Sequence, residues 1–478
     1  MNDMMRAILL IIIDALCAKR LGCYGSNAHL TPNIDRLSKM GVLFERAFSC
    51  TNATDPSMTT ILTGMHPLSH GVIRHGSHVD VEDLKYLSYL IPLPRFLRRY
   101  GYRTIAIDWL GRWHKRGFDV YFSPTANDVG FLQLLYSIIN QLNSLRYASK
   151  PKRLSSILRF SQYLASLSWQ IGKRLIFDAS KVTQLTINLL KRMITRGKNE
   201  KIFLLIHYWD THAPYLAPQS VALKSLLAPT LSSLRALGVT RRKIMEVIAD
   251  IIMERYFLAL KSIDNNIGSL VNFLDAEGLL DETIIALTSD HGESLIEHGI
   301  FFDHHGLYEP TIHVPLIITA PNLPKNVRVK AIVQHIDLMP TLLSLIGFRP
   351  IYCDGSSLLP LIASQTSRER NLRSYALMVE TYRQFKLAIR TERYKYIESP
   401  SLKAAICKSC GHVHGGVREL YDLIEDPKEE VNLVQSKSEI ASMLSTLLRE
   451  VTSLYMTRRE QLRKLFMKNI KLLVSRNI

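Results

Sequence analysis

The stretch Ala7-Ile-Leu-Leu-Ile-Ile-Ile-Asp14, near the start of the 478-residue chain, decides the fold. A continuous apolar run that ends in a carboxylate is typical of a central parallel strand, whose last residue lies at the C-terminal edge of its sheet. The run is too short to cross a bilayer, is preceded by Asp3, and ends at Asp14 without the small-residue cleavage site of a secretory signal. It therefore predicts a buried first strand.

Three further apolar runs end in polar residues in the same way. They cover 104–107 before Asp108, 202–206 before His207, and 283–288 before Asp290. Helical patterns at 32–40, 90–100 and 244–277 lie between the strands. This alternation predicts an α/β fold, a three-layer αβα sandwich around a mostly parallel sheet. Ligands of such sheets bind beyond the C-terminal strand ends, where these polar residues fall.

The rest of the chain departs from this rhythm. Residues 128–199 are rich in Leu, Ser and basic residues with helical spacing, and beyond 347 short strand-like pieces precede a helical pattern from 438. We expect a catalytic domain over 1–347 with a helical insertion at 128–199. A smaller antiparallel-sheet subdomain over 348–437 and a basic helical tail over 438–478 complete the organisation. A solvated basic lid is favoured for the insertion, and peripheral membrane contact is left open.

Composition narrows the class of protein. Hydrophobic residues at 47% and charged residues at 21% are typical of a compact globular chain. A net charge of +18 would attract any polyanion, but no RNA-recognition, zinc-finger or helix-turn-helix pattern accompanies it. Six cysteines in so long a chain do not suggest a disulfide scaffold, and we expect a cytoplasmic protein. Oligomeric state leaves no mark on the sequence.

The clearest candidate metal ligands follow the run 283–288. Asp290 and His291 come directly after that strand, and Asp14 follows the first one. Carboxylate oxygen and imidazole nitrogen suit a divalent cation such as Zn²⁺ or Mn²⁺. Further histidines gather near the strand ends, at His207-Tyr-Trp-Asp-Thr-His212 and at His298, His304 and His305. The clustering favours a metal site over scattered structural histidines.

The candidate nucleophile lies in Asn52-Ala-Thr-Asp-Pro-Ser-Met-Thr-Thr-Ile-Leu-Thr-Gly64. Asp55 is a good N-cap residue and Pro56 suits the first helical position, so we expect a helix from there to Gly64. Thr54 then sits just before the helix N-terminus, where the dipole and free N–H groups stabilise an alkoxide and an anionic substrate. A structural helix cap without a catalytic role is the alternative.

Taken in order, the chain's motifs resemble those of the alkaline phosphatase and sulfatase superfamily. The motifs are Ile11-Ile-Ile-Asp-Ala-Leu16, Leu21-Gly-Cys-Tyr-Gly25, Thr31-Pro-Asn-Ile-Asp-Arg-Leu37, Leu62-Thr-Gly64, Ser69-His-Gly71, Ser289-Asp-His-Gly-Glu293, Leu307-Tyr-Glu309, Val314-Pro-Leu316, Asp337-Leu-Met-Pro-Thr341, Arg393-Tyr-Lys-Tyr396 and Glu419-Leu-Tyr-Asp-Leu423. The resemblance covers most of the chain outside the expected insertion and tail. It implies a metal-dependent hydrolase that acts on an anionic ester.

The resemblance also implies roles for individual residues. The implied ligands of one cation are Asp14, Thr54, Asp290 and His291, with Thr54 also the nucleophile. His212 and His304 would be catalytic, facing the anionic group of the substrate. Phosphoryl-transfer relatives often hold a second metal, for which the candidates are Asp210, His212 and His305. We prefer Zn²⁺ or Mn²⁺, with Ca²⁺ or Mg²⁺ and either one or two ions left open.

Departures from the family pattern bear on the substrate. Sulfatases carry Cys or Ser in a C/S-x-P-S-R motif, oxidised to formylglycine, whereas this chain reads Thr54-Asp-Pro-Ser-Met58. The β-methyl group of Thr54 prevents that oxidation from giving an aldehyde. We therefore expect cleavage or transfer of a phosphoester through a Thr54 intermediate, as in a phosphodiesterase. A sulfuric ester hydrolase is the alternative, and an inactive, basic polyanion-binding protein on the same scaffold is the second.

A separate candidate site is Cys407-Lys-Ser-Cys-Gly-His-Val-His414. Cys407, Cys410, His412 and His414 could hold a structural Zn²⁺. Structural zinc sites usually draw ligand pairs from separated segments, so a zinc-stapled hairpin and an unliganded loop are both left open.

Overall fold

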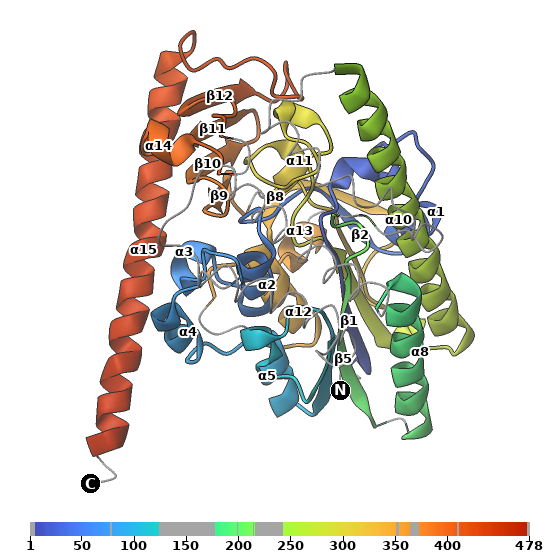
Figure 1. Ribbon diagram of the computed structural model, residues 1–478. Coiled ribbons are helices and arrows are strands. Elements are labelled where there is room, and N and C mark those ends of the chain that lie inside the picture. The colour runs from blue at the N-terminus through green and yellow to red at the C-terminus, as the bar shows by residue number, and fades with distance from the viewer. Residues whose placement is uncertain are drawn as a thin grey trace, which may run out of the picture.

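The computed structural model describes residues 5–76, 79–123, 177–197, 199–213, 215, 242–349, 353–363, 372–408 and 411–475. In this part of the chain, eight strands form one large sheet (Figure 1). Its order is β4 (Val120–Phe122), β3 (Tyr102–Ile107), β5 (Lys201–Tyr208), β1 (Ala7–Ile13), β6 (Thr283–Thr288), β7 (Leu316–Thr319), β2 (Val42–Phe48) and β8 (Val327–Gln334). Only β7 runs antiparallel to its neighbours, so the sheet is mostly parallel, as expected.

Strand β1 is the centre of the sheet. It pairs in parallel with β5 and with β6, so that Ala7 lies opposite both Ile202 and Thr283. All seven of its residues are buried, because side chains that alternate between the two faces are covered by helices on both. Each fully buried Ile or Leu of this kind contributes about 1.5–3 kcal/mol.

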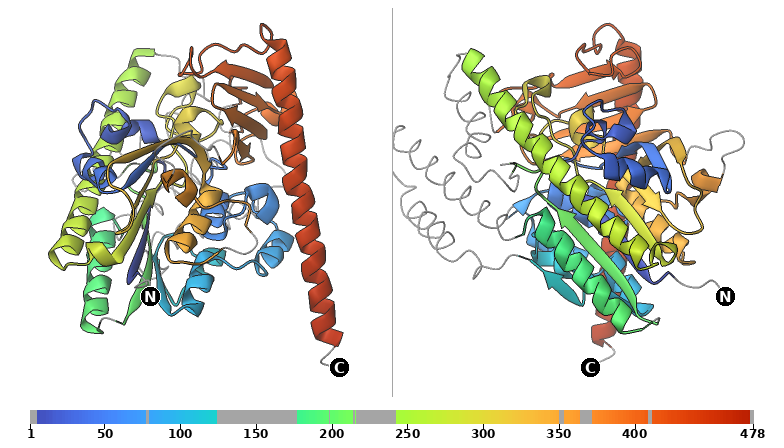
Figure 2. Two further views of the ribbon diagram at one scale, coloured as in Figure 1. Left: turned by 180° about the vertical axis from the view of Figure 1, so that it is seen from behind. Right: turned by 90° about the vertical axis from the view of Figure 1, so that its right-hand side faces the viewer.

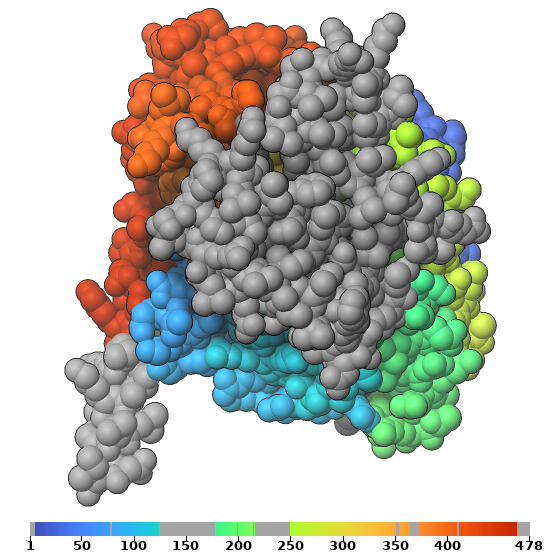
Figure 3. Space-filling model, viewed as in Figure 1, coloured from blue at the N-terminus to red at the C-terminus, as the bar shows by residue number. Residues whose placement is uncertain are grey.

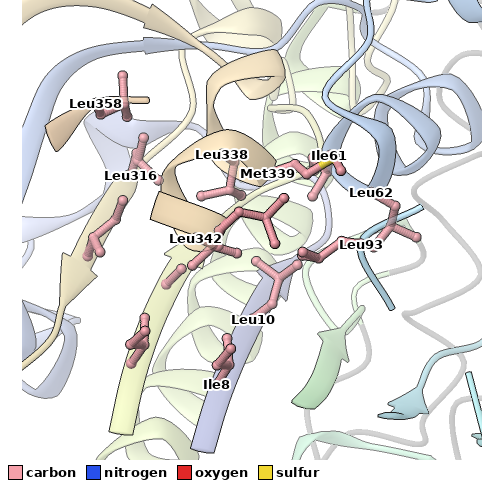
Figure 4. Packing of buried hydrophobic residues seen from close by; sticks show 14 of the residues in the cluster. Ile8, Leu10, Ile61, Leu62, Leu93, Leu316, Leu338, Met339, Leu342 and Leu358 are labelled. Atoms are coloured by element: carbon pink, nitrogen blue, oxygen red, sulfur yellow. The ribbon is translucent and has the colours of Figure 1, made fainter. Parts of the chain in front are cut away.

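Helices cover both faces of the large sheet. One face carries α1 (Pro32–Lys39), α8 (Ala179–Thr195) and α10 (Arg242–Ala276), of which α8 and α10 lie side by side (Figure 2). The other face carries α2 (Thr54–Thr63), α5 (Leu93–Arg99), α12 (Leu338–Leu345) and α13 (Leu359–Ala363). On that face Ile8 and Leu10 point from β1 toward Leu342 (Figure 4). The expected three-layer αβα sandwich is confirmed.

A second sheet follows in the C-terminal part. It is antiparallel, in the order β12 (Arg418–Asp422), β11 (Tyr394–Glu398), β10 (Lys386–Thr391) and β9 (Tyr375–Glu380). Helix α15 (Ser438–Ser475) packs Leu444, Leu448 and Val451 into the same apolar cluster as Leu377 and Ile389. The second sheet and α15 lie along one side of the molecule, opposite α8 (Figure 3). This confirms a smaller antiparallel subdomain with a helix.

Two observations bear on the expected division of the chain. Helix α8 lies inside the range expected as an insertion, yet it packs on β5 as part of the sandwich. The described tail is the single helix α15, whose first half belongs to the core of the small subdomain. Residues 128–176 of the expected insertion lie outside the described residues, and the domain boundaries stay predictions. A membrane-spanning helix, which needs about 20 mostly apolar residues, is not found among the described residues.

Candidate active site and metal centre

The C-terminal ends of β1 and β6 bring three candidate ligands together. Asp14 follows β1, while Asp290 and His291 follow β6, and all three side chains are fully buried. Their ligand atoms lie within 4.8 Å of one another. Nε2 of His291 is 3.8 Å from Oδ1 of Asp14 and 3.4 Å from Oδ2 of Asp290. Parallel pairing of the two strands therefore places these residues as the sequence predicted.

The turn after β1 aims Asp14 at this cluster. Ala15 has a φ of 58°, a left-handed conformation that is uncommon for a residue other than glycine. Its N–H donates to Oδ1 of Asp290 at 3.2 Å, and the N–H of Leu16 donates to Oγ of Ser289 at 3.0 Å. These bonds lock the β1 turn against the β6 turn. Sharply turned backbone held by its surroundings is common at functional sites.

Thr54 is the first residue of α2 and faces the same cluster. Its Oγ1 lies 3.3 Å from Nε2 of His291, and the residue is buried. Oγ of Ser57, one turn further on, donates to the backbone oxygen of Asp290 at 2.6 Å. Helix α2 is thus tied to the metal-ligand turn, with its N-terminus directed at the site. The Thr54 hydroxyl therefore lies beside the candidate metal ligands.

Asp55 does not cap helix α2 as the sequence suggested, because the N-cap residue is Ala53. The Asp55 carboxylate accepts hydrogen bonds from Nη2 of Arg112 at 2.7 and 2.8 Å and lies 3.1 Å from Nε2 of His114. Burial would raise the pKa of Asp55, but hydrogen bonds from His114 and His75 hold it well below its usual range. The carboxylate therefore stays ionised beside the nucleophile.

Arg112 and His114 were absent from the sequence-based site. They lie in the short helix Arg112–Lys115, which follows strand β3. The sequence did carry a signal for them, since Arg112 and His114 flank Trp113 shortly after the predicted strand end at Asp108. Basic residue types at that place could have been added to the predicted site. Met58, which stands where the sulfatase motif has arginine, is fully buried in the apolar cluster under α2. The structure supplies a guanidinium near the helix start from Arg112 instead.

A second pair missing from the predicted site is His207 and Asp108, at the ends of β5 and β3. Nδ1 of His207 lies 2.7 Å from Oδ1 of Asp108, and Nε2 of the same ring lies 3.7 Å from Oδ2 of Asp14. Burial raises the pKa of Asp108, but the hydrogen bond with His207 brings it below its usual value. The sequence marked both residues as polar strand ends and counted the stretch that begins with His207 toward a metal site, but it did not predict their pairing.

His212 and His304 lie at the mouth of the cluster, as the family resemblance implied. The ring centroids of His304 and His291 are 4.4 Å apart, and those of His304 and His212 are 5.6 Å apart. Burial and then the neighbouring His291 lower the pKa of His304 well below its usual value. The His304 ring is therefore neutral near neutral pH, with one ring nitrogen that donates a hydrogen bond and one that accepts.

The three candidates for a second catalytic metal do not converge. Oδ1 of Asp210 accepts the N–H of Ala179 at the start of α8 at 3.1 Å. Nε2 of His305 lies 3.3 Å from Nε2 of His414, and His305 groups with Cys407 and His414 rather than with Asp210 and His212. The expected second site is therefore corrected by removing His305 from it, because His305 groups with two residues of the C-terminal subdomain.

The candidate structural zinc set also changes. Cys407 and His414 are buried and close together, whereas His412 is exposed and Cys410 lies outside the described residues.

The residues at the strand ends fit a divalent cation. Oδ2 of Asp290 is buried and accepts no hydrogen bond from the described residues. A buried carboxylate oxygen of this kind is costly unless a cation or a donor approaches it. Two carboxylates, one imidazole and a hydroxyl make a donor set that Zn²⁺ and Mn²⁺ accept.

Taken together, the fold and the site place the Thr54 hydroxyl, at a helix N-terminus, against a buried cluster of candidate metal ligands. Comparison with known proteins gives the family. A model of the Sulfatase family matches residues 6–348, and one described as N-sulphoglucosamine sulphohydrolase, C-terminal, matches residues 296–456. The chain belongs to the sulfatase family, within the alkaline phosphatase and sulfatase superfamily, and is a hydrolase. Members of this superfamily generally use a divalent metal, and this chain has a candidate ligand group for one.

Individual relatives agree with this assignment. The chain is 26% identical over 492 residues to an N-acetylglucosamine-6-O-sulfatase of Bacteroides thetaiotaomicron, covering 92% of this chain and 84% of the relative. A phosphonate monoester hydrolase of Agrobacterium radiobacter shares the fold, with a TM-score of 0.65, 19% identity and coverage of 95% and 96%. So does a structure solved with its substrate D-glucosamine-2-N,6-O-disulfate, with a TM-score of 0.64, 20% identity and coverage of 96% and 98%.

Proposed function

We propose that this protein is a divalent-metal-dependent sulfuric ester hydrolase that uses unmodified Thr54 as its nucleophile. The observation that carries the proposal is the placement of Oγ1 of Thr54, 3.3 Å from Nε2 of His291 and beside the buried carboxylates of Asp14 and Asp290. The choice of a sulfuric ester is supported by relatives that are named sulfatases and align with most of the chain. It reverses the order of preference drawn from the sequence.

The reaction divides into two steps on the residues described. The Thr54 oxygen forms a bond to sulfur while the bond from sulfur to the alcohol oxygen breaks. The proton lost by Thr54 balances the proton taken up by the departing alcohol. Water then attacks the sulfur of the Thr54 sulfate ester and releases sulfate. A divalent cation held by Asp14, Asp290 and His291 would lower the pKa of the hydroxyl and offset the negative charge.

The other residues of the site bind and orient the anionic ester. The imidazole rings of His212 and His304 face the cluster and can donate hydrogen bonds to ester oxygens. Arg112, held by Asp55, places a positive charge near the start of α2. The helix N-terminus adds a partial positive charge on the same side. Hydrogen-bond donors and positive charge on this side therefore favour binding of a negatively charged ester group beside Thr54.

A phosphoester is the second candidate, and Thr54 itself favours it. An unmodified hydroxyl must be freed from its sulfate or phosphate ester by attack of water, whereas an aldehyde hydrate can eliminate the group through its second hydroxyl. Phosphothreonine cleavage at a metal site is a two-step route of this kind. The candidate of an inactive polyanion-binding protein gains no support, because the buried ligand set is intact.

Substrate profiling of the purified chain separates these candidates. The protein is assayed with an aryl sulfate, an aryl phosphate and a bis-aryl phosphate, in the presence of Zn²⁺ or Mn²⁺. We expect turnover of the aryl sulfate that Thr54→Ala abolishes. Faster turnover of either phosphate, also lost in Thr54→Ala, would replace the sulfuric ester by a phosphoester. Activity that survives Thr54→Ala would overturn the proposed nucleophile.

A further inference from the structure

A second cluster of metal-ligand side chains lies beside the active site. His305 follows His304 in the loop after β6, while Cys407 and His414 lie in the loop between β11 and β12. All three are buried, and their ligand atoms lie within 4.8 Å of one another. The cluster, called the His305 cluster below, therefore joins the large domain to the C-terminal subdomain.

Outer contacts fix the orientation of both imidazole rings. Nδ1 of His305 lies 3.3 Å from Oδ2 of Asp303, and Nδ1 of His414 lies 3.3 Å from the backbone oxygen of His298. Both oxygens are acceptors, so each Nδ1 carries the proton in the neutral ring. Each Nε2 is then an acceptor as well. Two such acceptors lie 3.3 Å apart and face each other.

That separation is the one a tetrahedral zinc requires. Two nitrogens, each about 2.0–2.1 Å from Zn²⁺ and at a tetrahedral angle, lie about 3.3 Å apart. A cation between the rings would also turn the contact of two acceptors from unfavourable to favourable. Cys407 adds a sulfur ligand, and a Cys and two His residues form a donor set that Zn²⁺ prefers over Ca²⁺ or Mg²⁺. Asp303 behind His305 is the carboxylate partner typical of zinc-bound histidines.

The backbone of the second loop is shaped to present its two ligands. The N–H of Cys407 donates to the oxygen of His412 at 2.8 Å, and Ile406 forms a bridge with Val413. Nζ of Lys386, from β10, donates to the oxygen of His414 at 2.7 Å. These bonds hold the loop closed against the second sheet, so Cys407 and His414 point inward while His412 stays exposed.

We infer that the His305 cluster binds a structural Zn²⁺ ion through His305, Cys407 and His414, distinct from the catalytic metal. This ion ties the C-terminal subdomain to the loop that carries His304. Asp303 couples the two sites, because its Oδ1 accepts the N–H of His304 at 2.8 Å while its Oδ2 faces His305. His305, Cys407 and His414 are positioning residues for His304. The inference holds whether the substrate is a sulfate or a phosphate ester.

Zinc content of the full chain tests the inference. Protein is produced with zinc, purified without chelator and analysed by mass spectrometry of the metal. Cys407→Ala and His414→Ala should each lose one equivalent relative to the natural protein, whereas His412→Ala, in the same loop, should lose none. Asp290→Asn, at the catalytic metal, should keep the equivalent that Cys407→Ala loses. Unchanged zinc content in both Cys407→Ala and His414→Ala would overturn the inference.

Cobalt substitution covers the case in which these variants fail to fold. The natural chain is loaded with Co²⁺ and its absorption spectrum recorded. A thiolate-to-cobalt charge-transfer band is expected, because Cys407 binds the ion directly, and it should persist in Asp290→Asn. Absence of this band from natural protein that has taken up Co²⁺ would show that the two histidines share a proton and not a metal.

Discussion

Nδ1 of His207 lies 2.7 Å from Oδ1 of Asp108, and this contact holds the opposite ring nitrogen 3.7 Å from Oδ2 of Asp14. The three residues come from three adjacent strands: Asp108 follows β3, His207 lies in β5, and Asp14 follows β1. The imidazole of His207 thus lies between two carboxylates. The arrangement orients a candidate metal ligand from behind. Residues in such positions tune metal affinity without touching the metal.

Asp108→Asn should therefore weaken metal binding. Removing the carboxylate frees the His207 ring to rotate, and loss of such a partner reduces metal affinity or activity by about 10- to 100-fold. Metal titration of the apoprotein measures the effect. Asp119→Asn is the matched control, because Asp119 also accepts hydrogen bonds from β3, through Thr104, but lies outside the cluster. Equal loss of affinity in both variants would assign Asp108 a purely structural role.

Thr54→Ala should lower kcat by about 10³-fold or more, since the variant keeps the metal ligands but has no hydroxyl group to form the covalent intermediate. Thr54→Ser should retain measurable turnover. The intermediate itself is checked by acid quenching during turnover and peptide mass spectrometry, with a sulfated or phosphorylated Thr54 expected. Thr63→Ala serves as the control and should leave kcat unchanged, because the Thr63 hydroxyl, at the far end of the same helix, bonds to the oxygen of Thr59 and the N–H of Met65.

Asp55→Ala should destabilise the fold by about 1–3 kcal/mol, because it removes the buried acceptor of the hydrogen bonds with Arg112 and His114. Chemical denaturation measures this change. Glu200→Ala removes an exposed ion pair with Arg196 and should change stability by less than about 1 kcal/mol. A similarly small effect for Asp55→Ala would mean that solvent replaces the lost carboxylate.

Stability should fall below neutral pH through His66. Its Nε2 lies 3.1 Å from the backbone oxygen of Leu377 and its Nδ1 accepts the N–H of Leu68, while the ring stacks on Tyr455. Burial lowers the pKa of His66 from 6.5 to about 3. The folded state therefore binds fewer protons than the unfolded state between these two values.

The stabilising contribution of neutral His66 is complete above pH 6.5 and is lost as pH falls toward 3. The slope within this window is about 1.4 kcal/mol per pH unit. Urea denaturation at several pH values should show a shallower dependence in His66→Gln than in the natural protein. His29→Gln, at an exposed position, is the control and should follow the natural curve.

The central strands and the first metal ligands could be predicted from the sequence because local pattern decides them. Strand β1 is a continuous apolar run buried on both faces, and its bounds match the prediction. Asp14, Asp290 and His291 follow from strand ends that must meet at one edge of a parallel sheet. Strand β2 was missed because Glu45 and Arg46 interrupt its apolar pattern, and its place is set by distant pairing with β7 and β8.

Other parts of the site depend on contacts that residue type alone does not specify. Asp55 is a residue type that often caps helices. Its carboxylate instead contacts Arg112 and His114, which lie more than fifty residues later in the chain. The family resemblance made His305 a candidate for a second catalytic metal, but its Nε2 lies 3.3 Å from Nε2 of His414 in the C-terminal subdomain. Such choices between partners are made by tertiary packing.

The position of β1 between β5 and β6 has a consequence for synthesis of the chain. β1 leaves the ribosome before the other strands of its sheet, and its two partners begin only at Lys201 and Thr283. The most apolar strand thus waits for nearly two hundred residues of translation before one of its edges is covered. Unpaired apolar edges invite association with other chains. Nascent chains of this protein should accordingly depend on chaperones that shield residues 7–13 until β5 emerges.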